Sequence, residues 1–176
     1  MSKNDKITIG LSTSSHPVSK LIEFAGRSKV SHAFLSYQDE KINIPTIFHS
    51  NHWGVHRQTK KSFLKKNIIL AEYIVSHSRA LSAARQLGRH LDSGYDYGGM
   101  FIAGWYTLFR KWFGIRMERR EGCTVNAMMC SETIAWYLRY LDLDMFRNIS
   151  PEAFAPWDLL DLMRDNKIFV KIIDEA

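Results

Sequence analysis

The sequence predicts a single α+β domain in which an antiparallel sheet packs against helices. Its 176 residues, 45% of them apolar and 12% aromatic, can bury one core and indicate one domain over residues 1–176. Segments with the alternation of strands come first, segments of helical period follow, and a last strand returns near the end. This separation of strands from helices favours an α+β fold over a doubly wound parallel sheet.

Strands are expected where apolar and β-branched residues lie between polar turns. The second and third flank the polar turn at 38–40, so we expect a hairpin in which His32 lies near Ile47. Residues 51–55 have the composition of a loop. The expected strands cover residues 7–11, 31–37, 41–49, 68–75 and 168–173.

Helices are expected where apolar residues recur at helical spacing. A short one includes Pro17, a residue that the first turn of a helix tolerates. Segment 100–113 is strongly apolar and aromatic, which predicts a buried helix or, alternatively, the lining of a groove for an acyl chain or lipid. Further helices are expected from Ala80 to Leu91, from Ser131 to Leu141 and after Pro156.

The chain carries a net charge of +6, with 24 basic and 18 acidic residues. This excess favours a polyanionic surface as a partner of the basic face. For the lysine and arginine clusters themselves, a basic face that contacts only solvent is the favoured interpretation and a polyanionic partner the alternative, and specific nucleic-acid binding is not expected because no element that reads nucleic acid accompanies the charge. The basic clusters consist of Lys60, Lys61, Lys65 and Lys66, and of Arg116, Arg119 and Arg120.

Neither a signal peptide nor a transmembrane segment is expected. The N-terminal residues 1–6 are polar and charged, and the chain has no apolar run of about 18 residues. The default location is therefore cytoplasmic, and an enzyme acting on the cell wall would need another route of export.

Cys130 stands immediately before the helix expected from Ser131. The unpaired N–H groups and the dipole at the start of a helix stabilise a thiolate, and the same groups can hold an oxyanion. We therefore expect Cys130 to be a nucleophile whose thiol pKa is lowered. A buried cysteine that only fills apolar space is the alternative interpretation.

A nucleophilic cysteine needs a base, and two histidines lie on the expected hairpin. His32 begins one strand and His49 ends its partner, and the alternation of the strands puts both on one face. Such a diagonal pair lies about 7 Å apart or less, so His49 could orient His32 through its second ring nitrogen. The alternative is that both are half-exposed histidines without a catalytic role.

Three short motifs in this order resemble the circularly permuted papain-like branch of the NlpC superfamily, in which the histidine strand precedes the nucleophile helix. They are residues 31–34 (Ser-His-Ala-Phe), 95–99 (Tyr-Asp-Tyr-Gly-Gly) and 130–132 (Cys-Ser-Glu). Residues 150–151 (Ser-Pro) and 156–160 (Pro-Trp-Asp-Leu-Leu) also resemble the closing segment of that family. The similarity extends over about residues 7–163.

The resemblance implies a papain-like (NlpC-type) fold in permuted order and a catalytic set of Cys130, His32 and His49. His49 takes a position where many permuted relatives have glutamate. Tyr95 would border the site, and Tyr95 and Ser131 would contact the substrate or the oxyanion, although turn packing alone is the alternative for Tyr95. Glu132 would complement the helix dipole and take no part in the reaction.

The function implied is that of a cysteine peptidase or amidase without a cofactor. His32 would deprotonate Cys130, which would attack an amide or isopeptide bond of a peptide or acyl-amide substrate, such as cell-wall peptide, to form an acyl-enzyme that water hydrolyses. The alternatives are a lipid or acyl thioesterase or acyltransferase on the same fold, and a catalytically idle module that binds peptides.

Histidine and cysteine residues can also bind zinc or form a disulfide. His49, His52 and His56 have spacings that could suggest zinc, but a loop would not align the three rings, so no metal is expected. A disulfide between Cys123 and Cys130 is not expected in the cytoplasm, and it would leave Cys130 without the free thiol that a nucleophile needs.

Overall fold

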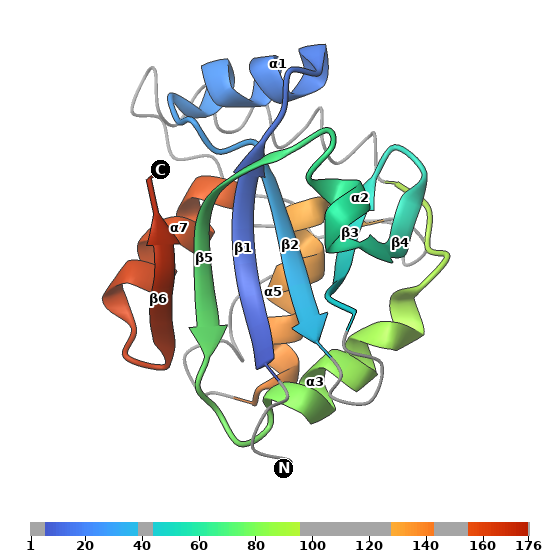
Figure 1. The fold of residues 1–176 in the computed structure, drawn as a ribbon, viewed down its shortest axis with the longest axis vertical. Coiled ribbons are helices and arrows are strands. Elements are labelled where there is room, and N and C mark those ends of the chain that lie inside the picture. The colour runs from blue at the N-terminus through green and yellow to red at the C-terminus, as the bar shows by residue number, and fades with distance from the viewer. Residues whose placement is uncertain (1–5, 39–43, 96–127, 143–154, 176) are drawn as a thin grey trace, which may run out of the picture.

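The structure, a computed structural model, describes residues 6–38, 44–95, 128–142 and 155–175 (Figure 1). Within these residues six strands form one antiparallel sheet in the order β4-β3-β2-β1-β5-β6. The strands are β1 (Lys6–Thr13), β2 (His32–Gln38), β3 (Thr46–Asn51), β4 (Gly54–Thr59), β5 (Ile68–Val75) and β6 (Phe169–Asp174). The prediction of an α+β fold with an antiparallel sheet is confirmed.

Helices lie on both faces of the sheet and at one of its ends. In Figure 1, α5 lies behind β1 and β2, α2 lies on the opposite side beside β3, and α1 crosses one end of the sheet. None of the helices in the described part of the chain is long and apolar enough to span a bilayer. The helices are α1 (Pro17–Gly26), α2 (Lys60–Phe63), α3 (Ala80–Leu87) with the 3-10 turn η1 (Gly88–His90), α5 (Cys130–Tyr140) and α7 (Pro156–Asp165).

The main core lies between one face of the sheet and helices α3, α5 and α7. Strand β1, the partner of both β2 and β5, is buried along most of its length. Each large aliphatic side chain that is removed from water here contributes roughly 1.5–3 kcal/mol. Among the fully buried members of this core are Ile9, Leu11, Leu35, Leu87, Ile134, Leu138, Leu141 and Leu159.

A smaller apolar cluster on the opposite face holds α2 against the sheet. It consists of Phe34 from β2, Ile47 from β3 and Phe63 from α2. The ring of Phe34 lies directly over Gly10, where a Cβ atom would come within 2.0 Å of the ring. Gly10 is therefore needed for Phe34 to lie flat on β1 and contact Phe63, whose ring centroid is 4.9 Å away.

An ion pair between the half-buried Lys60 and the buried Glu72 ties the start of α2 to the sheet. Glu72 of β5 is 4% exposed, and its carboxylate accepts hydrogen bonds from Lys60 Nζ at 2.7 and 2.8 Å. The hydroxyl of Thr8 donates a third hydrogen bond at 2.7 Å. These donors compensate for removing the carboxylate from water, and they fix the helix that carries Phe63.

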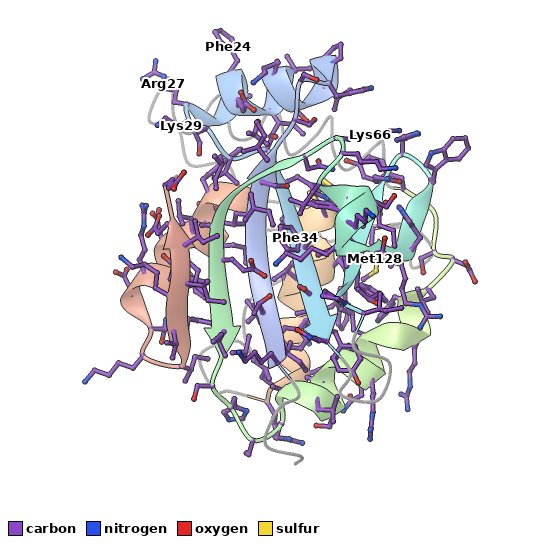
Figure 2. All side chains as sticks on the ribbon, viewed as in Figure 1. Phe24, Arg27, Lys29, Phe34, Lys66 and Met128 are labelled. Carbon is purple, nitrogen blue, oxygen red and sulfur yellow. The ribbon has the colours of Figure 1, made fainter. Side chains whose placement is uncertain are left out.

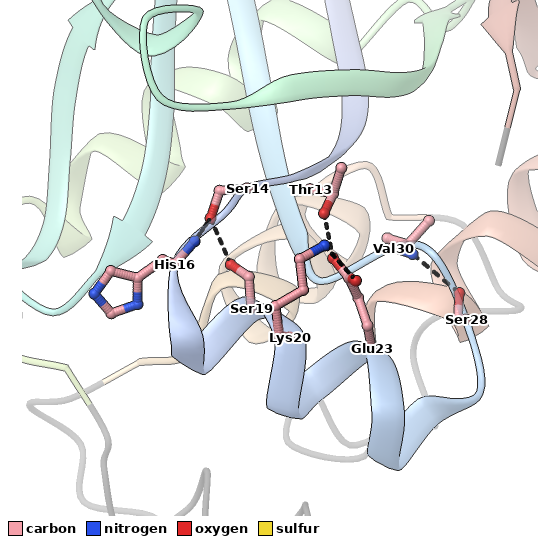
Figure 3. A network of polar contacts seen from close by, with 8 residues as sticks. All are labelled: Thr13, Ser14, His16, Ser19, Lys20, Glu23, Ser28 and Val30. Carbon is pink, nitrogen blue, oxygen red and sulfur yellow. Dashed lines mark hydrogen bonds and ion pairs between the residues drawn. The ribbon is translucent and has the colours of Figure 1, made fainter.

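Helix α1 is joined to β1 by a polar network (Figure 3). The ring of His16 accepts a hydrogen bond from the backbone of Val18 at the helix start, and Pro17 follows in the first turn. Glu23 accepts hydrogen bonds from Thr13 and, at 2.8 Å, from Lys20. The outer side of α1 carries exposed apolar side chains, and Figure 2 shows one of them, Phe24, pointing away from the sheet.

The strand predicted over 68–75 is confirmed, whereas the loop predicted over 51–55 is shorter than expected. The chain turns at His52 and Trp53 and re-enters the sheet as β4. Gly54 has a φ of 90° and adjoins Ser93, whose carbonyl oxygen a Cβ would approach to 2.2 Å. Strand β4 was missed because it lies at the edge of the sheet. Its exposed residues alternate with half-buried polar residues, so no apolar run marks it as a strand.

The predicted register of the hairpin is also wrong. Ile47 pairs with Ser36, four residues along β2 from His32, and the described part of the third strand begins at Thr46. A shift by an even number of residues keeps every side chain on its face of the sheet. The expectation that His32 and His49 share a face therefore survives the error in register.

Candidate active site

His32 and His49 form a hydrogen-bonded pair at one end of β2 and β3. His32 Nε2 lies 2.9 Å from His49 Nδ1, and the two rings are nearly perpendicular, at 87°. His49 is 3% exposed, and His32 is half-buried. The structure thus brings the predicted base together with the residue predicted to orient it.

The pair lies where β2 and β3 have stopped pairing. The ladder between these strands consists of Leu35–Phe48, Ser36–Ile47 and Tyr37–Thr46, so both histidines lie beyond its last pair. The backbone N–H of Ala33, which follows His32, is one of the groups that lower the pKa of the Cys130 thiol. The start of α5 therefore meets β2 next to the histidine, at the place where β3 leaves it.

A second contact anchors the start of α5 to β3. The buried hydroxyl of Ser50 donates a hydrogen bond to the carbonyl of Met128 at 2.5 Å. Ser50 follows His49 directly, so the two strands that carry the histidines both hold the segment that carries Cys130. The structure brings His32 and His49 together, but within the described residues neither ring contacts the Cys130 thiol: both rings lie with Phe63 on the α2 face of the sheet, whereas Cys130 begins α5 on the other face.

Cys130 is the first residue of α5, and it is a free thiol that is 6% exposed. The backbone N–H of Met129 donates to the carboxylate of Glu132 at 3.2 Å, and the hydroxyl of Thr133 donates to the carbonyl of Met129 at 2.9 Å. Glu132 therefore acts as a helix cap, in the kind of structural role that its first-turn position predicts.

The thiol pKa does not follow the prediction. Burial raises the pKa of Cys130 above its ordinary value, and the backbone N–H groups of Ala33, Ser131 and Cys130 itself lower it by less. The expectation of a lowered pKa considered the helix start alone and left out the cost of burying a thiolate. In the unliganded protein the thiol is the favoured form.

Both histidines are neutral at neutral pH. Burial, followed by the nearby His56, lowers the pKa of His32 from 6.5 to about 4. Burial, followed by repulsion from His32 and His56, lowers the pKa of His49 to about 2. A neutral imidazole is the form that can accept a proton from a thiol.

Phe63 and Gln58 complete the surroundings of the histidines. The ring of Phe63 stacks on His32 at a centroid distance of 6.0 Å and meets the edge of His49 at 5.3 Å. Gln58 Nε2 lies 2.8 Å from His49 Nε2. Phe63 and Gln58 were not predicted from the sequence. Gln58 could have been found, because the alternation of a strand paired with β3 puts His56 and Gln58 on the same face as His49.

His56 lies directly opposite His49, with ring centroids 4.4 Å apart. Its Nδ1 donates to the carbonyl of Gly54 at 3.0 Å, and its Nε2 faces the side-chain amide of Asn51. His52 instead lies in the turn, beside Trp53. In the part of the chain that the structure describes, no group of three histidine, cysteine or acidic side chains is arranged to hold a metal ion.

Of the two residues predicted to contact the substrate or the oxyanion, Tyr95 precedes Cys130 in the sequence and Ser131 follows it directly. Ser131 is the second residue of α5, is buried, and its backbone N–H is one of the groups that lower the pKa of Cys130. Tyr95 is half-buried and follows Gly94, whose carbonyl accepts a hydrogen bond from the backbone N–H of Met128 at 2.9 Å. Both residues are therefore held close to Cys130 by the backbone, while the rest of the predicted turn, 96–99, lies outside the described residues.

The basic face is only partly within the described residues. Lys60 is engaged by Glu72, whereas Lys61, Lys65 and Lys66 are exposed. The arginine cluster at 116–120, the apolar segment 100–113, Cys123 and residues 150–151 all lie outside the described residues.

No protein-family model matches the sequence, and no curated protein matches it. The function is therefore inferred from the chemistry of the site and from the motifs that the sequence carries.

Proposed function

We propose that this chain is a cysteine hydrolase of the permuted papain-like type, with Cys130 as nucleophile, His32 as general base and His49 as the residue that orients His32. One observation carries the proposal: the imidazole of His32 is hydrogen-bonded to that of His49, and the backbone N–H of Ala33, the residue after His32, is one of the groups that lower the pKa of the Cys130 thiol. The order of the chain, with the histidine strands before the nucleophile helix, agrees with the permuted arrangement.

The proposed reaction is acyl transfer from an amide to Cys130. His32 engages His49 through Nε2, and its Nδ1 takes the thiol proton in the tautomer in which His32 Nε2 donates to His49 Nδ1. The sulfur then attacks the amide carbonyl, and the N–H groups at the start of α5 stabilise the oxyanion. The C–N bond breaks as His32 returns the proton to the leaving amine, and water, deprotonated by His32, hydrolyses the thioester.

The neutral resting state is compatible with this reaction. A buried thiolate and a buried imidazolium are both disfavoured here, so proton transfer accompanies attack on a bound substrate instead of preceding it. The raised thiol pKa also favours one alternative, an idle module that binds peptides in the same frame without cleaving them.

Trapping of an acyl-enzyme distinguishes these functions. The protein is incubated with an activated ester, with short peptide amides and with a lipid ester, and acylated residues are mapped by mass spectrometry. The comparison uses wild type, Cys130→Ala, His32→Ala and, as a control, His52→Ala at the exposed turn. We expect a thioester on Cys130 in wild type and His52→Ala, none in Cys130→Ala, and slow formation in His32→Ala. Acylation that is absent from wild type, or that does not depend on His32, would leave the binding module as the better account.

A further inference from the structure

Gln58 holds the ring nitrogen of His49 that does not face His32. Its side-chain nitrogen lies 2.8 Å from His49 Nε2, while His49 Nδ1 lies 2.9 Å from His32 Nε2. The three side chains therefore form one continuous line from β4 through β3 to β2. A proton placed at one end of such a line determines where the protons lie at the other end.

The orientation of the Gln58 amide decides the chemistry of His32. An amide nitrogen can only donate, so in the observed orientation His49 Nε2 accepts and His49 Nδ1 donates to His32 Nε2. A neutral His32 then has its proton on Nδ1, and Nδ1 cannot act as a base. If the amide is turned by 180°, its oxygen accepts from His49 Nε2, His32 donates through its own Nε2, and Nδ1 is free to take a proton.

The surroundings restrict other ways of making this change. Phe63 contacts the faces or edges of both rings, which opposes a flip of either imidazole. His56 lies beside His49, but its nitrogens face Gly54 and Asn51. Rotation of the Gln58 amide keeps the shape of that side chain and leaves both rings in place.

We propose that Gln58 is a positioning residue that, acting through His49, sets which nitrogen of His32 is the base. The inference rests on the proposed function, since it concerns the protonation of the proposed base. The observed orientation holds the pair in a resting form, and the form with the amide oxygen toward His49 is the reactive one.

Two substitutions separate this role from simple packing. Gln58→Glu supplies only acceptors, so it holds His49 and His32 in the reactive form, whereas Gln58→Met fills similar space without choosing a form. Arg57→Met, at the neighbouring exposed position of β4, is the matched control. The titratable group that faces the pair is His56 on β4, with the ion pair of Lys60 and Glu72 on the α2 side of the sheet.

The first readout is the protonation of His32 itself, measured from the nitrogen chemical shifts of its ring in labelled protein. We expect an unprotonated Nδ1 in Gln58→Glu, a protonated Nδ1 as the main form in wild type and in Arg57→Met, and a mixture in Gln58→Met. Identical shifts in all four proteins would overturn the inference. This readout needs no catalysis, so it tests the role of Gln58 even if the proposed function fails.

The second readout is the rate of Cys130 acylation as a function of pH. We expect Gln58→Met to react about tenfold more slowly, Gln58→Glu to react at least as fast as wild type near neutral pH, and Arg57→Met to match wild type. In Gln58→Glu the acid limb moves to higher pH, because a carboxylate raises the pKa of the histidines. Equal losses in the Glu and Met variants, in step with equal losses of thermal stability, would show that Gln58 only packs.

Discussion

His32 Nε2 and His49 Nδ1 lie 2.9 Å apart although the strands that carry them no longer pair at these residues. The backbone N–H of Ala33, the residue after His32, is one of the groups that lower the pKa of the Cys130 thiol. The end of the ladder thus leaves the two histidine rings free to face each other.

Replacing His49 tests whether it orients His32. In His49→Ala the Nε2 of His32 loses its partner, and we expect acylation of Cys130 to slow by about 100-fold. His49→Asn should recover part of this loss, because an amide oxygen can accept the Nε2–H of His32. His52→Ala serves as the control. Equal rates in wild type and His49→Ala would show that the hydrogen bond has no catalytic role.

Ser50 should anchor the nucleophile segment. Ser50→Ala leaves the buried carbonyl of Met128 without this donor, which is expected to lower the free energy of unfolding by about 1–3 kcal/mol. We also expect slower acylation, because the start of α5 is held less firmly. Chemical denaturation and acylation rates of Ser50→Ala are compared with those of Ser82→Ala, an exposed serine on α3. A matching stability for the two variants would contradict the assigned role.

The ion pair beneath α2 should be needed to keep Phe63 on the histidines. Lys60→Met leaves the carboxylate of Glu72 buried with Thr8 as its remaining donor among the contacts described, and we expect a loss of about 3–5 kcal/mol in the free energy of unfolding. The double variant Lys60→Met/Glu72→Gln removes both charges and should recover most of this loss. Lys61→Met, at an exposed neighbour, is the control. If Lys60→Met and Lys61→Met unfold at the same denaturant concentration, the pair contributes nothing to the position of α2.

Acid should destabilise the fold through the histidine pair. The pKa values of His32 and His49 are lower in the folded chain than the ordinary 6.5, so unfolding takes up protons below that pH. Stability is complete above about pH 6.5 and falls as the pH decreases toward 4, by roughly 1.4 kcal/mol per pH unit for each histidine that gains a proton on unfolding. The lowered pKa of His90 acts in the same direction.

Comparison with His49→Gln isolates the contribution of the pair from that of His90. Urea denaturation at pH 7 and pH 5 should show a smaller difference in unfolding free energy for His49→Gln than for wild type. The same pH dependence in both proteins would mean that His49 can be protonated within the folded chain.

Much of this architecture could be predicted from the sequence, because it depends on local pattern. Alternation in the strands placed His32 and His49 on one face, and the change to helical period placed Cys130 next to a helix start. The register could not be predicted, because it depends on how the chain passes between Gln38 and Thr46. Gln58 was missed together with β4, whose polar alternation resembles that of a loop, and the direction of the thiol pKa depends on burial, which only the packed structure shows.

The most direct test is the rate of Cys130 alkylation by iodoacetamide across pH, compared between wild type and His32→Ala. Both proteins carry Cys123→Ala, which leaves one cysteine, and His52→Ala is the control. If the two residues act as a nucleophile and its base, wild type and His52→Ala should react at least about tenfold faster than His32→Ala at neutral pH. The three proteins should converge at high pH, where the thiol ionises without help. Identical rates for wild type and His32→Ala at every pH would contradict the proposed catalytic pair.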